Sequence, residues 1–231
     1  MTAGYGVLYH RRLPDGMTTP HPDVELHVLP TSESSREALG RLFAGNGTIY
    51  LVVGFFTYNA YRDIEPEIVD FLDRNPENEL HIVVGPGTDQ FSPRIGRDLW
   101  SLDAADRVHL YARRHGLHPK LYLRDGPEPM AIHTSANITK VGFEYNVELG
   151  IELRAADREE PALEPFLEWM DELIEDSHAL RRRDLLWPVQ VLNALVNWTG
   201  KVRVLPARHI IRTAIPVAIV LGLAVRLCRQ S

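Results

Sequence analysis

The chain is poor in cysteine, and it has no segment that resembles a secretory signal. Cys228 is the single cysteine among 231 residues, which excludes an internal disulfide and fits a reducing compartment. Residues 1–13 contain no apolar core followed by a small-residue cleavage site. We therefore expect a cytoplasmic protein.

Basic residues are outnumbered by acidic ones, 25 to 31, so the formal net charge is −6. An acidic surface argues against indiscriminate wrapping of nucleic acid by the whole protein. With 45% hydrophobic and 24% charged residues, the composition is that of a globular protein. The length allows one domain of about 150 residues and an appendage.

Runs of Asp, Glu and His at metal-ligand spacing are absent as well. The sequence therefore suggests no metal centre and no other cofactor, and the chemistry has to come from the side chains themselves.

Residues 117–125 carry the most informative pattern. Residues 117–123 alternate between polar and apolar side chains and predict a strand, with His118, Lys120 and Tyr122 on one face. His118 and Lys120 should then point into the same space.

A predicted hairpin adds a hydroxyl and a carboxamide to this pair. A turn rich in Gly and Pro leads into residues 130–134, which predict a returning strand, so that Ser135 and Asn137 come back toward His118. Imidazole is a nucleophile near neutral pH, and ammonium and amide groups stabilise charge on phosphate oxygens. The set suits attack on a phosphodiester without a metal ion.

These residues resemble the phospholipase D superfamily and its His-Lys-Asp motif. The pattern consists of His118-x-Lys120 with Asp125 five residues beyond the lysine, Ser135-x-Asn137, and a downstream Asn-x-Glu that ends at Glu148. It is most similar to the one-motif members, the small bacterial nuclease and the metal-independent restriction endonucleases. The resemblance spans residues 48–153 and is strongest over 117–152. The family usually has glycine before the serine, where this chain has threonine.

The resemblance implies a role for each motif residue. His118 would be the nucleophile that forms a phosphohistidine, Lys120 and Asn137 would bind the phosphate, and Ser135 would orient groups around it. Glu148 falls where the nuclease members place an acid that supports the histidine.

Each assignment has a plainer alternative. His118 and Lys120 could be an exposed pair on a surface strand, and Ser135 could form a turn. Asp125 directly precedes a glycine and could equally be a turn residue. Glu148 lies in an alternating strand and could belong to its solvated face.

Superfamily sites combine two His-Lys motifs, one histidine attacking and the other protonating the leaving oxygen. None of the nine other histidines of this chain has lysine two residues later. The sequence therefore predicts a symmetric homodimer in which the two copies of His118 meet at the axis, or a partner chain that supplies the second motif.

Basic residues concentrate around the motif. Residues 105–140 contain six Lys and Arg against three Asp and Glu, together with four of the ten histidines. This composition predicts a positive mouth for a polyanionic or phospholipid substrate, with Arg113, Arg114 and Lys140 as substrate-binding candidates. The alternative is a solvated strand edge.

The whole pattern predicts an α/β sandwich with a mixed central β-sheet flanked by helices, formed by a catalytic domain at residues 1–180. Strands are expected at 5–10, 24–29, 48–56, 80–84 and 108–111, and helices after 31, at 64–72, 94–102 and 159–176.

Residues 181–231 predict an apolar helical tail. Residues 213–225 carry no charge and would span about 20 Å as a helix, short of the roughly 30 Å hydrocarbon core. Membrane contact through residues 210–228 is one interpretation. A helix in the core or dimer face, and a helix lying among the head groups, are the others.

Three functions fit these observations. The first is a metal-independent phosphodiesterase that cleaves nucleic acid as a homodimer. The second uses the same chemistry on a phospholipid, held at the bilayer by the tail. The third is a non-catalytic module that binds phosphate groups.

Overall fold

The computed structural model describes residues 23–29, 32–85, 91–113, 116–146, 148–155 and 163–185. The predicted strand at 5–10, the candidate Arg114 and the predicted tail beyond residue 185 lie outside them.

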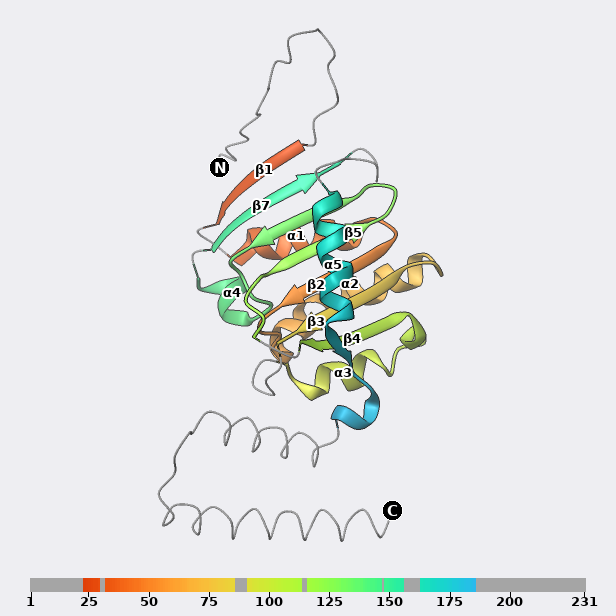
Figure 1. Ribbon diagram of the computed structural model, residues 1–231. Helices are drawn as coiled ribbons and strands as arrows, with labels where there is room; N and C mark the ends of the chain where they lie inside the picture. The colour runs from red at the N-terminus through yellow and green to blue at the C-terminus, as the bar shows by residue number, and fades with distance from the viewer. Residues whose placement is uncertain are drawn as a thin grey trace, which may run out of the picture. The chain divides into compact units, whose positions relative to one another are not determined.

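A mixed sheet of eight strands is the centre of the fold, in the order β1-β7-β6-β5-β2-β3-β4-β8 (Figure 1). Strands β2, β3 and β4 are parallel to one another, and the other neighbours are antiparallel. The strands are β1 (Asp23–Leu29), β2 (Thr48–Val53), β3 (Glu79–Val84), β4 (Val108–Arg113), β5 (Leu121–Asp125), β6 (Met130–Thr134), β7 (Glu148–Arg154) and β8 (Ser177–Ala179).

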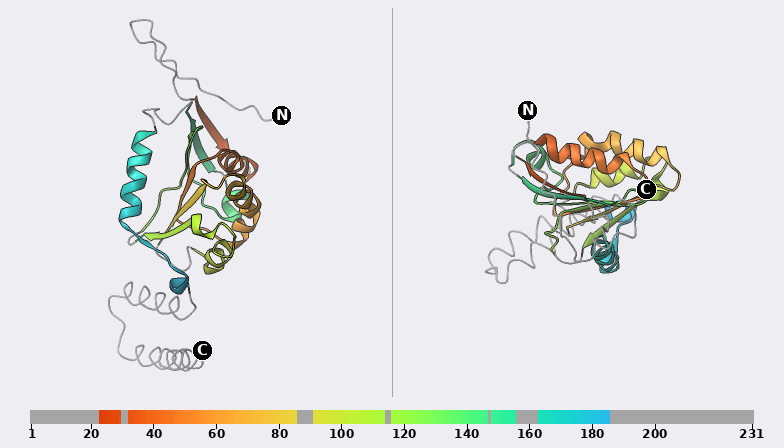
Figure 2. Two further views of the ribbon diagram at one scale, coloured as in Figure 1. Left: turned by 90° about the vertical axis from the view of Figure 1, so that its right-hand side faces the viewer. Right: turned by 90° about the horizontal axis from the view of Figure 1, so that it is seen from above.

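Helices cover both faces of the sheet, with α5 on one face and the others on the opposite face (Figure 2). They are α1 (Ser32–Ala44), α2 (Tyr58–Arg74), α3 (Pro93–Leu99), α4 (Lys140–Glu144) and α5 (Glu164–Glu175), with short 3₁₀ turns at Ala105–Arg107 and Arg182–Leu185. The predicted α/β sandwich with a mixed central sheet is confirmed.

The core forms where these layers meet. Val52, Val83 and Leu123 of the central strands pack with Met170 and Leu173 of α5, and all five are at most 2% exposed. Because β2 and β3 are covered on both faces, they are nearly continuous apolar runs.

Two element boundaries differ from the sequence prediction. Strand β5 begins at Leu121 rather than at residue 117, because Pro119 has no N–H to donate and disfavours regular pairing of the residue before it. Helix α2 begins at Tyr58, so Pro66 lies inside the helix and not in its first turn. Pro66 is exposed, so the carbonyl group that it leaves without an amide donor lies on the solvent side of the helix.

The described residues up to Arg181 form one compact unit. Of the unit that follows, only residues 182–185 are described, and the predicted tail stays a prediction. Within the described ranges, no helix combines the length and the apolar character needed to cross a membrane.

Arg124 connects strand β5 to the end of helix α1. Its guanidinium donates to the backbone oxygens of Arg41 at 2.9 Å and Leu42 at 2.7 Å, and to that of Glu128 at 2.8 and 2.9 Å. It lies so close to Gly45 that a Cβ there would be 2.3 Å from its Cζ atom. Arg124 thus satisfies carbonyl groups that the helix end cannot satisfy by itself.

We predict that Arg124→Met lowers the free energy of unfolding by about 3 kcal/mol, because buried carbonyl groups lose charged hydrogen-bond donors. Urea unfolding followed by circular dichroism measures this loss. Arg62→Met on helix α2 is the control. The Arg62 side chain is 56% exposed and makes one ion pair, with Glu65 of the same helix, so its loss should change the free energy of unfolding by less than about 0.5 kcal/mol. Equal effects of the two variants would contradict the role given to Arg124.

Candidate active site

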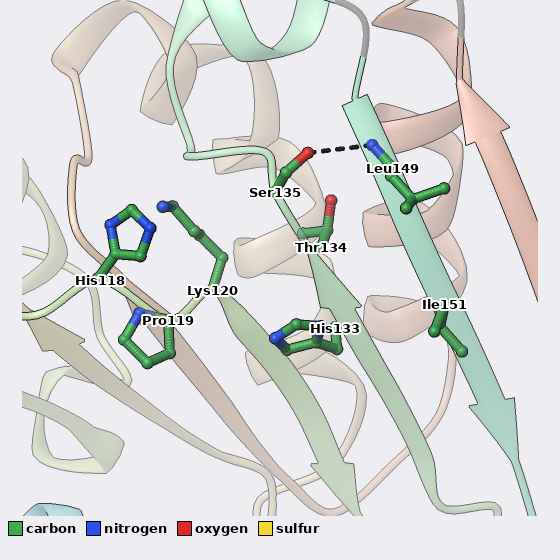
Figure 3. Close-up of a pocket in the computed structure, with 8 residues that line it drawn as sticks. All are labelled: His118, Pro119, Lys120, His133, Thr134, Ser135, Leu149 and Ile151. Carbon is green, nitrogen blue, oxygen red and sulfur yellow. Dashed lines mark hydrogen bonds between the residues drawn. The ribbon is translucent and has the colours of Figure 1, made fainter.

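A cavity of about 380 Å³ opens where strand β5 begins and strand β6 ends (Figure 3). Strand β5 is antiparallel to β2, so this edge of the sheet also holds the carboxyl ends of β2, β3 and β4. The residues that line the cavity are His118, Pro119, Lys120, His133, Thr134, Ser135, Leu149 and Ile151.

His118 and Lys120 meet in this cavity, as the motif predicts. The His118 ring is exposed, and Figure 3 shows the Lys120 side chain directed toward it. Lys120 is only 8% exposed, yet no carboxylate or other acceptor in the described part of the chain pairs with its ammonium group. The ammonium group can therefore take an anion in the cavity as its hydrogen-bond partner.

Ser135 is held by strand β7 through three hydrogen bonds. Its hydroxyl donates to the Glu148 carboxylate and accepts from the Leu149 amide at 3.0 Å, and its own amide donates to the Leu149 carbonyl at 2.9 Å. Glu148 is 8% exposed and also accepts from the Asn146 side chain at 3.0 Å. The acid therefore contacts Ser135 and Asn146 rather than the His118 ring.

Two hydrogen bonds, from Tyr122 and to Thr134, hold the turn after strand β6. The Tyr122 hydroxyl donates to the Ala136 carbonyl at 2.7 Å, and the Ala136 amide donates to Thr134 Oγ1 at 3.1 Å. Burial, with a smaller contribution from Glu148, raises the pKa of Tyr122 well above its usual value, so the phenol stays a donor. Thr134, at the family's glycine position, supplies a hydroxyl that fixes the Ser135 turn.

Asn137 lies beside the cavity without lining it. Its side-chain oxygen accepts from the Phe55 amide at 3.0 Å, which leaves the NH₂ group as a donor. The segment after β2 runs close to the segment before β5, since a Cβ on Gly54 would be 2.9 Å from the Leu117 carbonyl oxygen. A phosphate contact by Asn137 stays a prediction.

The structure does not bring Asp125 to this cavity. It ends strand β5, five residues after Lys120, which corresponds to about 17 Å along an extended chain. Its backbone carbonyl lies against Gly47, where a Cβ would be only 2.1 Å away. This position fits the alternative of a turn residue.

Two of the three basic candidates, Arg113 and Lys140, do not line the cavity, and the third, Arg114, lies outside the described residues. Arg113 pairs with Asp176 at 3.0 Å and stands on β4, three strands from β5 in the sheet. Lys140 pairs with Glu144 at 3.5 Å on helix α4. Among the described residues that line the cavity, Lys120 is the only Lys or Arg.

Sequence analysis missed four lining residues, Pro119, His133, Leu149 and Ile151. Alternation places His133 on the face of β6 that also carries Ser135, and this pattern could have found it. Strand β7 exposes Leu149 by 54% and Ile151 by 43% while it buries Glu148. Alternation alone does not show which face of a strand is buried. In β7 the apolar face is the exposed one, so hydrophobicity would have given the opposite assignment.

Comparisons with known proteins agree on the fold. No protein-family model matches the chain, and no curated protein matches its sequence. Solved structures do match. NucT from Helicobacter pylori superposes with a TM-score of 0.53 and 17% identity, covering 69% of this chain and 100% of that one. Nuc from Salmonella typhimurium, a phospholipase D family member, gives 0.54 and 18%, covering 70% and 99%. Phosphatidylserine synthase from Haemophilus influenzae gives 0.58 and 13%, covering 78% and 46%.

We predict that Lys120→Met weakens binding of tungstate, a phosphate analogue, by about tenfold or more, because the cavity loses its charged donor. Isothermal titration calorimetry measures the affinity. Lys140→Met is the matched control and should bind like the unmodified chain, since Lys140 pairs with Glu144 outside the cavity. Similar losses in both variants would mean that Lys120 does not form the anion site.

Proposed function

We propose that this chain, which has the fold of the phospholipase D superfamily, is a metal-independent phosphodiesterase acting through a phosphohistidine on His118. One observation carries the proposal. An exposed imidazole and a lysine ammonium group that has no partner among the described residues line one cavity of about 380 Å³, which is enough space for a phosphodiester.

The reaction runs in two displacements. A nitrogen of His118 attacks phosphorus, an N–P bond forms, and the P–O bond to the leaving alkoxide breaks. Lys120 stabilises the charge on the equatorial oxygens. Water then attacks the phosphohistidine, which releases the phosphate monoester and restores the imidazole.

Ser135 and Glu148 act as positioning residues in this scheme. Because its proton is donated to Glu148, the Ser135 hydroxyl presents lone pairs rather than a donor to the cavity. It suits orientation of the attacking water or of the ammonium group better than direct binding of phosphate.

The leaving oxygen needs an acid, and the chain has one motif. We infer a symmetric homodimer in which the partner subunit's His118 protonates the leaving group. Two observations support it. The matched region is a complete chain in Nuc and NucT but less than half of phosphatidylserine synthase. The exposed Leu149 and Ile151 also give the rim of the cavity an apolar surface that a second copy can cover.

Nucleic acid is the proposed substrate. The motif resembles the single-motif nucleases, and exposed aromatic rings lie on segments at the same edge of the sheet. Tyr145 is 72% exposed and Phe55 40% exposed, so both can stack on bases. Tyr61 and Phe143 are buried and cannot stack on bases.

A phospholipid is the second candidate, favoured by the same apolar rim. Leu149 and Ile151 line the cavity directly, and Val141 of α4 is 53% exposed. Acyl chains would bury these side chains, whereas the paired Arg113 and Lys140 offer little to a long polyanion.

We predict that the purified chain cleaves nucleic acid in excess EDTA and that His118→Ala lowers turnover about 10³-fold or more. With a substrate labelled at phosphorus, a reaction quenched with alkaline detergent should trap a covalent phosphoryl enzyme, because the N–P bond of a phosphohistidine survives alkali but not acid. His133→Ala is the matched control, because it removes the other imidazole of the cavity and should still form the adduct.

The same assay on phosphatidylcholine and cardiolipin vesicles distinguishes the two substrates. Turnover of vesicles alone would select the phospholipid. An adduct that persists in His118→Ala and disappears in His133→Ala would overturn the nucleophile, and activity restored only by a divalent metal would overturn the mechanism.

The homodimer has its own test. Wild-type and His118→Ala chains carrying different affinity tags are co-expressed, and the mixed dimer is purified through both tags in turn. We predict that it is nearly inactive, because its one site lacks a histidine, while a doubly tagged wild-type dimer is fully active. Half activity would mean that each chain has its own complete site, and failure to recover any mixed dimer would exclude the assembly.

A further inference from the structure

Two histidines and a glutamate converge on the sheet away from the cavity. His81 on β3 and His109 on β4 are direct neighbours in the register of these parallel strands. Glu79 precedes His81 by two residues, so it projects from the same face. This is the face covered in part by α5, since Val83 and Tyr111 on the same side of the two strands pack in the α5 core.

The three side chains are close enough to share one ion. Glu79 Oε2 lies 3.1 Å from His81 Nε2 and 4.0 Å from His109 Nε2, and one ligand atom from each residue falls within 4.8 Å of the others. Ligand atoms about 2.1 Å from a tetrahedral zinc ion lie about 3.4 Å apart. Small side-chain rotations therefore bring this set to ligand geometry.

The surroundings favour a bound cation over a solvated cluster. The His81 side chain is 14% exposed and packs against Tyr50 at 5.0 Å and Tyr111 at 5.9 Å between ring centroids. Its Nδ1 is buried without a hydrogen-bond partner in the described residues. Glu79 and His109 are 45% and 38% exposed, which leaves a path for an ion and a water ligand.

We propose that Glu79, His81 and His109 form a binding site for a divalent transition-metal ion, with Zn²⁺ as the best match. Two imidazoles and one carboxylate are a ligand set that zinc accepts with water in the fourth position. The only ion pairs of Glu79 in the described residues are with these two histidines, so no lysine or arginine competes for its charge.

This site is separate from the catalytic cavity. His81 pairs with Tyr50, whereas β5 begins opposite Val52, close to the cavity. The offset is about 7 Å along the strands and two strands across the sheet. The ion would link β3 to β4 and stabilise the fold without entering the phosphodiester chemistry, so the inference does not depend on the proposed function.

The experiment uses the full chain, stripped of metal with a chelator and dialysed, then titrated with ZnCl₂. We expect the melting temperature to rise by about 5 °C or more, and equilibrium dialysis to show one more bound Zn²⁺ per chain than in His109→Ala. Co²⁺ should give the visible bands of a four-coordinate site. His109→Ala should abolish the thermal shift and these bands, and the isosteric Glu79→Gln should weaken both.

His178→Ala is the matched control. His178 pairs in register with Ala112, whose side chain projects from the sheet face opposite to that of His109, so this variant should keep the full zinc response. A shift of equal size in His109→Ala and the unmodified chain would assign the ion to other residues, and no shift in the unmodified chain would exclude the site.

Equal melting temperatures of the metal-free unmodified chain, His109→Ala and Glu79→Gln would show that both variants fold. If His109→Ala does not fold, the thermal shift of Glu79→Gln decides the test.

Discussion

The orientation of strand β7 is the constraint on which the site depends. Side chains of a strand alternate between two faces, so burying Glu148 and Glu152 obliges Leu149 and Ile151 to face outward. Glu152 is fully buried between Arg41 at 2.6 Å and Arg154 at 2.5 Å, and although burial opposes it, these two partners lower the pKa of the carboxyl group. This charged cluster fixes which face of β7 turns inward, since a slip by one residue would bury Leu149 and expose both acids.

The orientation of β7 also shapes the edge of the sheet that holds the cavity. Glu148 is the first residue of β7 and reaches the Ser135 hydroxyl, while the next residue, Leu149, holds Ser135 through its backbone and lines the cavity with its side chain. One strand therefore supplies both the acid that orients the serine and the apolar rim of the cavity. Exposing the apolar Leu149 and Ile151 to water is unfavourable in free energy. A partner subunit or a substrate that covers them removes this penalty.

The sequence predicts the residues of the site better than their environment. The motif names His118, Lys120 and Ser135 correctly as neighbours, because a short hairpin sets their distance locally. The concentration of basic residues suggests a substrate contact for Arg113, whereas packing between distant segments pairs this residue with Asp176. The motif includes Asp125, but the extended strand between Lys120 and Asp125 keeps the two residues apart. The residues of the proposed zinc site escape a search by spacing, because His81 and His109 are 28 positions apart and only the register of two strands brings them together.

The unpaired Lys120 ammonium group gives the strongest argument that the cavity is functional and not a packing defect. Every other buried charge described above has partners: Glu152 has two arginines, Glu148 has a hydroxyl and an amide, and Arg124 has three carbonyl groups. Lys120 differs from them, because its ammonium group has no partner among the described residues. Because the one exception faces the exposed imidazole of His118, its missing partner is best explained as an anion that comes and goes.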